Sequence, residues 1–75
     1  MAARDVQRRI GANLRRVRLE AGHTQESFAL HLGFHRTYIG GVERGERNLT
    51  LRTLERLADA LGIDATELFT VTPPS

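Results

Sequence analysis

Residues Gln25 to Arg44 read QESFALHLGFHRTYIGGVER and determine how this chain folds. This stretch predicts two short helices joined by a tight turn at Gly33, because glycine takes the positive φ of such a turn without a Cβ penalty. Ala29 is small, which lets the second helix cross close to the first. The residues expected to face inward are Ala29, Leu32, Ile39 and Val42.

The second helix of this pair also has a polar face, which carries His35, Arg36, Thr37 and Arg44. Two helices that cross at a tight turn, with polar side chains exposed on the second, form a helix-turn-helix. Such a unit offers its polar face to the major groove of DNA. The local sequence therefore predicts DNA binding.

Apolar residues at three- and four-residue spacing predict three more helices outside this stretch. The five expected helices span about 5–21, 25–32, 35–44, 51–61 and 65–69. The expected N-caps are Asp5, Thr24, Thr50 and Asp64. Ser27 lies three residues after Thr24, so a strict capping box is not expected there. We predict an all-α fold: one compact five-helix domain over residues 1–75, with a frayed tail at 70–75.

Gly40 and Gly41 are an unusual pair for the interior of the expected third helix. Each glycine costs about 0.5–1 kcal/mol of helix stability relative to alanine. We therefore expect the backbone to approach something closely at this point, either a neighbouring helix or DNA.

Composition narrows the function classes. The chain has 75 residues and no cysteine, so disulfides and thiolate metal sites are excluded. His23, His31 and His35 lack supporting ligands, and Gly33 separates the last two, so no metal and no cofactor are expected. No nucleophile has a partnered base nearby and a domain of this size offers little pocket, so no enzyme is expected. No apolar run reaches membrane-spanning length, and we expect a cytoplasmic, nucleoid-associated protein without a small-molecule ligand.

All eleven basic residues are arginine, and the formal net charge is +2. Two interpretations of this bias stay open. Arginine makes bidentate contacts to phosphate and guanine that lysine does not match. A GC-rich genome would also encode arginine in place of lysine throughout a chain.

Four motifs follow one another along the chain. They are Arg18-x-x-x-Gly22 with Thr24-Gln25, then Phe28-Ala29 with Gly33, then Ile39, Val42-Glu43 and Gly45, and finally Leu54, Leu57-Ala58 and Ala60-Leu61-Gly62-Ile63. Together they resemble the Cro/repressor-type (XRE) helix-turn-helix regulators. The runs 35–39 (HRTYI) and 43–50 (ERGERNLT) are similar to restriction–modification controller proteins, which are small dimeric regulators. The Gly40-Gly41 pair departs from the family pattern, which usually has serine or another small residue first.

Arg36 and Thr37 are the expected base-reading residues, because the first turn of the third helix points into the groove in this architecture. The arginine can bind guanine O6 and N7 together, and the threonine methyl suits a thymine methyl. His35 either contacts DNA or caps the helix. Gln25, at the start of the second helix, and Tyr38 are expected to bind phosphate. Plain packing is the alternative for Tyr38.

The resemblance implies that the loop after the third helix runs beside the DNA backbone, which assigns DNA contacts to Arg47, Asn48 and Thr50. Turn and cap chemistry alone also explains Asn48 and Thr50. The family pattern implies a structural salt bridge between Arg18 and Glu43. The full set of expected DNA-binding residues is Gln25, His35, Arg36, Thr37, Tyr38, Arg47, Asn48 and Thr50.

One helix-turn-helix unit contacts few base pairs, so specific binding to double-stranded DNA is expected to need a homodimer on a two-fold symmetric operator. Leu68, Phe69 and Val71 are the expected dimer contacts, with burial in the core as the alternative. The predicted function is that of a sequence-specific transcriptional regulator, such as a restriction–modification controller. The competing hypothesis is an antitoxin-type module that neutralises a partner protein and regulates its own promoter.

Overall fold

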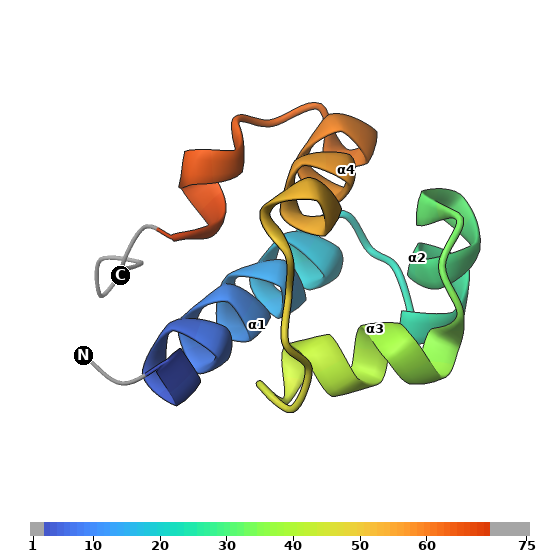
Figure 1. Cartoon of the computed structure of the whole chain (residues 1–75). Helices are drawn as coiled ribbons and strands as arrows, with labels where there is room; N and C mark the ends of the chain where they lie inside the picture. The colour runs from blue at the N-terminus through green and yellow to red at the C-terminus, as the bar shows by residue number, and fades with distance from the viewer. Residues whose placement is uncertain (1–2, 70–75) are drawn as a thin grey trace.

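The computed structural model describes residues 3–69, with side chains from residue 5. Its elements are α1 Ala3–Glu20, α2 Gln25–Leu32, α3 Arg36–Glu43, α4 Leu51–Leu61 and the 3-10 turn η1 Ala65–Leu68. Within this described part no residue is in a strand, so the predicted all-helical fold is confirmed there. Figure 1 shows α1 between the α2–α3 pair and η1. The α1 helix contacts both α3 and η1.

The prediction of five helices is wrong in one respect, because the described residues form four α-helices and a 3-10 turn. Residues 65–68 are too few for an α-helical hydrogen-bond ladder, and the N–H of Phe69 bonds to the carbonyl of Thr66 at 3.0 Å, three residues back. The Asp64 side chain accepts from the N–H of Thr66 and begins this turn. The tail predicted at 70–75 lies outside the described residues.

Two helix starts differ from the sequence prediction. α1 begins at Ala3, so Asp5 lies in its first turn and does not cap it. At the start of α2, the Thr24 hydroxyl accepts from the N–H of Ser27, and the Ser27 hydroxyl accepts from the N–H of Thr24, each at 3.0 Å. This reciprocal pair is a capping box, although not of the strict form that was expected to be absent. Serine takes the place that glutamate or glutamine usually fills.

Gly33 ends α2 with φ 78°, as the turn of a helix-turn-helix requires. The core beneath the turn combines all the elements. Its fully buried large side chains are Phe28, Leu14, Ile39, Leu57, Leu68 and Val42. η1 is held to α1 by a second contact, since the Asn13 amide donates to the carbonyl of Leu68 at 2.7 Å. This packing fixes α3 with one face inward and the other outward.

α1 and α3 approach closely at Gly11. A Cβ on this residue would lie 2.7 Å from the carbonyl oxygen of Glu43, and closer still to that of Val42. Real Cβ atoms do not come so near, and backbone cannot move aside as a flexible side chain can. A glycine of α1 therefore allows the close helix contact that was expected at Gly40 and Gly41. None of the helices in the described range is long and apolar enough to cross a membrane.

Candidate nucleic-acid interface

The first turn of α3 presents polar side chains to solvent. Arg36 and Thr37 are both exposed. His35 precedes them as the N-cap, and its Nδ1 accepts a hydrogen bond from the N–H of Thr37 at 3.2 Å. The capping interpretation of His35 is thus confirmed, whereas its contact with DNA stays a prediction. The cap leaves the side chains of Arg36 and Thr37 projecting from the helix start.

Tyr38 belongs to a row of four stacked side chains. Its ring stacks on Phe34 with centroids 5.4 Å apart and planes 17° apart. The guanidinium carbon of Arg47 lies 5.7 Å from the Tyr38 centroid, and that of Arg56 lies 4.8 Å from the Phe34 centroid. These distances are within the range of cation–π contacts. The row ties the loop after α3 and the α4 helix to the turn between α2 and α3.

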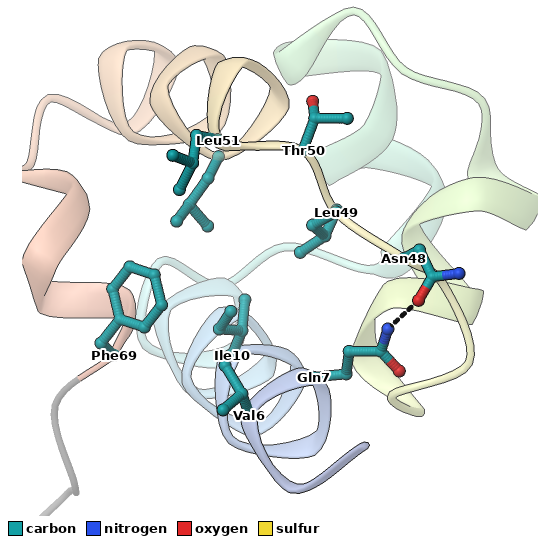
Figure 2. Close-up of a pocket in the computed structure, with 9 residues that line it drawn as sticks. Val6, Gln7, Ile10, Asn48, Leu49, Thr50, Leu51 and Phe69 are labelled. Atoms are coloured by element: carbon teal, nitrogen blue, oxygen red, sulfur yellow. Dashed lines mark hydrogen bonds between the residues drawn. The ribbon is translucent and has the colours of Figure 1, made fainter. Parts of the chain in front are cut away.

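The loop between α3 and α4 carries Asn48 and Thr50, both exposed. The Gln7 amide of α1 donates to Oδ1 of Asn48, so the amide nitrogen of Asn48 turns away from α1 (Figure 2). That nitrogen is a donor group suited to a phosphate oxygen. The Thr50 hydroxyl accepts from the N–H of Thr53 at 3.1 Å, which confirms its role as the N-cap of α4.

A buried salt bridge joins α1 to the end of α3. Nε of Arg18 lies 2.7 Å from one carboxylate oxygen of Glu43, and the guanidinium reaches the other at 3.1 Å. The side chains are 9% and 2% exposed, so the predicted pair is confirmed and is desolvated. Glu43 also accepts from the Gln25 amide at 3.1 Å. The arginine compensates a carboxylate that would otherwise repel phosphate from α3.

Arg44 follows this buried pair and is exposed. It pairs with Glu46 at 3.0 Å, and both side chains are more than half exposed. A pair of this kind contributes little to stability in water. The Arg44 guanidinium also lies against Gly40, where a Cβ would meet its Nη1 at 3.1 Å. Arg44 therefore covers the outer side of α3 near its C-terminal end.

An apolar groove of about 370 Å³ lies between the start of α1, the start of α4 and Phe69. Phe69, which follows η1, and Leu51, at the start of α4, both line it (Figure 2) and are 39% and 73% exposed. Leu68 is fully buried within the chain, so the core interpretation applies to it and a second copy cannot reach its side chain. Val71 lies outside the described residues.

The His23 and His31 rings stack with centroids 5.5 Å apart, and His23 Nδ1 lies 2.9 Å from the Ser27 hydroxyl. Over the residues that the structure describes, no three histidine, cysteine, aspartate or glutamate side chains gather as a metal site would need. The Asp64 carboxyl is more acidic than usual in the folded chain. Hydrogen bonds from the backbone N–H and then the hydroxyl of Thr66 hold the pKa of this carboxyl below its usual 3.8.

The sequence did not single out three of the residues that position this interface. Gln7 holds Asn48 from 41 positions away, and Phe34 and Arg56 complete the stacked row. Aromatic residues at 34 and 38 are four apart, but Gly33 and the helix start at Arg36 hide their spacing from a helical pattern. No local signal in the sequence pairs Gln7 with Asn48.

A helix-turn-helix with an exposed polar first turn on its second helix defines a class of DNA-binding proteins. Comparison with known families agrees, because the helix-turn-helix family model matches residues 14–68. The chain belongs to this helix-turn-helix family and is a transcriptional regulator of the XRE type.

Individual relatives and solved structures are similar to this chain over most of its length. The chain is 44% identical over 68 residues to an uncharacterized HTH-type transcriptional regulator, y4dJ, of Sinorhizobium fredii, covering 91% of this chain and 88% of the relative. The crystal structure of the restriction–modification controller protein C.AhdI from Aeromonas hydrophila is similar at 44% identity and a TM-score of 0.76, covering 84% of this chain and 96% of that one. A tetramer of the controller C.Esp1396I bound to its natural 35 base-pair operator matches at 36% identity and a TM-score of 0.74, covering 85% and 84%.

Proposed function

We propose that residues 1–75 act as a single domain that binds, as a homodimer, a two-fold symmetric operator and so controls transcription. The observation that carries the proposal is the capped, exposed first turn of α3 with Arg36 and Thr37. This turn would enter the major groove, where Arg36 would bind guanine and Thr37 would contact a thymine methyl. The chain would work in the cytoplasm and carry out no enzymatic step.

The flanking residues would hold the domain on the DNA backbone. Gln25 begins α2, whose first-turn N–H groups favour an anion, and Asn48 is oriented with its amide nitrogen outward. Thr50 ends the loop that follows α3, and Tyr38 contacts Arg47 of that loop, so both would bind the DNA backbone beside it. Arg47 lies against Tyr38 and would reach either phosphate or a base edge. Phosphate contacts of this kind set register, whereas Arg36 and Thr37 would set sequence preference.

The second copy would pack on the apolar groove. Leu51 and Phe69 are large apolar side chains left exposed on it, and Val6 and Leu49 extend the apolar lining. Two recognition helices placed by such a dimer would lie about 34 Å apart, one turn of DNA. The solved operator complex of C.Esp1396I contains a tetramer, which supports oligomeric binding in a protein of the same fold. A restriction–modification controller is the particular role that this similarity favours.

The test is selection of bound duplexes from a random pool, followed by titration of the selected site at two salt concentrations. We expect a two-fold symmetric consensus and an affinity that falls steeply with salt. Arg36→Ala should abolish the consensus at one position in each half-site. Arg16→Ala is the matched control, because Arg16 pairs with Glu20 on the side of α1 near Ile63. Absence of a consensus would contradict the proposal and favour a protein partner.

A further inference from the structure

The Gly40–Gly41 pair inside α3 is covered by arginine side chains. A Cβ on Gly41 would lie 3.0 Å from both Cγ and Nε of Arg47 and 3.5 Å from its Cδ. A Cβ on Gly40 would instead meet Arg44 Nη1 at 3.1 Å and Gln25 Oε1 at 3.4 Å. Arg47 therefore lies directly on the backbone of α3 at Gly41, and the glycine makes this possible.

The side chain of Arg47 continues from Gly41 to Tyr38. These two α3 residues are three apart and share one face of the helix. Arg47 crosses Gly41 with its aliphatic part, and its guanidinium carbon lies 5.7 Å from the Tyr38 ring centroid. Tyr38 is itself supported by its stack on Phe34. The long arginine thus runs along α3 toward the first turn, where Arg36 and Thr37 lie.

We propose that Gly41 is a positioning residue for Arg47, an inference that rests on the proposed function. Because Gly41 has no side chain, Arg47 packs directly against the backbone of α3. The guanidinium of Arg47 is thereby held over Tyr38 in the free protein. Ordering a long side chain at an interface carries an entropic cost, and preorganisation lowers that cost. Gly41 would therefore raise DNA affinity through Arg47 without touching DNA itself.

Helix energetics make this inference separable from a purely structural role. Alanine is favoured over glycine in a helix interior. Arg47 is exposed and its side chain can move by a few tenths of an ångström. Gly41→Ala should thus leave the fold as stable as before or more so, yet displace Arg47 and weaken DNA binding. If Gly41 were instead needed for packing, Gly41→Ala would lower the free energy of unfolding.

The first measurement uses the free protein and needs no DNA. The side-chain NMR resonances of Arg47 should carry a ring-current shift from Tyr38, the single tyrosine of the chain. Tyr38→Leu should remove this shift, and Gly41→Ala should reduce it. Gly40→Ala is the matched control, since it makes the same change one residue earlier and meets Arg44 rather than Arg47. Unchanged Arg47 resonances in Gly41→Ala would overturn the inference.

The second measurement is a double-mutant cycle of DNA affinity on the selected operator. Gly41→Ala should weaken binding about 3- to 10-fold in the wild-type background, because DNA must then order a displaced Arg47 side chain. In the Arg47→Ala background Gly41→Ala should leave the affinity unchanged, since no Arg47 side chain remains to be ordered. A loss that persists without Arg47 would overturn the inference by showing that position 41 acts on DNA directly. If Arg47→Ala bound the operator as tightly as wild type, the DNA role proposed for Arg47 would be contradicted. The NMR measurement on the free protein would show separately whether Gly41 positions the Arg47 side chain.

Discussion

α3 has two contrasting regions, a buried junction with α1 and an exposed face. At the junction, Glu43 is enclosed with Arg18, and Gly11 lets the two helices touch. On the exposed face, Arg36 and Thr37 project into solvent. One eight-residue helix thus divides its residues between stabilising the fold and offering polar side chains to a partner. Substitutions in the first region should change stability, and those in the second should change DNA affinity.

The largest effect is expected at the junction. Glu43→Ala leaves the Arg18 guanidinium buried without its carboxylate, which should lower the free energy of unfolding by about 3–5 kcal/mol. Urea unfolding followed by circular dichroism measures it. The control is Glu46→Ala, which breaks an exposed pair with Arg44 and should cost about 0–1 kcal/mol.

Replacement of both charges sharpens this result. An Arg18→Met, Glu43→Leu double variant should recover much of the stability lost by Glu43→Ala, because no unpaired buried charge remains. Equal losses for Glu43→Ala and Glu46→Ala would contradict the distinction between the buried and exposed pairs.

The next effect concerns the two kinds of glycine. Gly11→Ala forces a methyl group against the carbonyl oxygens of Val42 and Glu43, and we expect a loss of about 1–3 kcal/mol from this overpacking. The nearest atoms to a Cβ on Gly41 belong to the Arg47 side chain, which can move, so Gly41→Ala should cause no loss. Thermal unfolding of the two variants side by side provides the comparison. A Gly11→Ala protein as stable as Gly41→Ala would refute the close contact between α1 and α3.

A smaller effect is expected at Thr50, which ends the loop after α3 and caps α4. Thr50→Ala removes the acceptor for the N–H of Thr53 and should cost about 1 kcal/mol of stability. Thr50→Ser keeps the hydroxyl and should retain most of the stability. If the serine variant unfolds as readily as the alanine variant, the cap is not the reason for the loss.

The smallest effect is a pH dependence at Asp64. Its pKa is lower in the folded chain than the usual 3.8, so the native state binds fewer protons and stability rises with pH in that range. The contribution is complete above about pH 4, near the unfolded pKa, and disappears as pH falls through the folded pKa. Urea titrations from pH 6 to pH 3 should show a shallower acid loss for Asp64→Asn. Identical acid profiles would contradict the capping of Thr66 by an ionised carboxylate.

The sequence predicted the helix-turn-helix because its signals are local. Gly33 marks the turn, Ala29 and Leu32 are three apart on the first helix, and Ile39 and Val42 are three apart on the second, so short-range geometry determines the unit. The Arg18–Glu43 pair followed from the family pattern and is confirmed at 2.7 Å. Both depend on features that a motif preserves.

Other contacts depend on how helices and loops that are far apart in the sequence are oriented against one another. The Gln7–Asn48 hydrogen bond joins residues 41 positions apart. The close approach at Gly11 and the cover of Gly41 by Arg47 follow from how α1 and the loop settle on α3. The glycine pair signalled a close approach, but its spacing could not say whether backbone, DNA or an arginine filled the space. The roles of the exposed residues toward DNA stay predictions.

The most direct test of the account is base discrimination by Arg36. We would measure the affinities of wild type and Arg36→Ala for the selected operator and for a duplex with one base pair changed in each half-site. We predict that wild type prefers the operator by about 1–3 kcal/mol per changed contact, and that Arg36→Ala loses this preference while its unfolding curve is unchanged. Full discrimination by a correctly folded Arg36→Ala protein would show that Arg36 does not read the base.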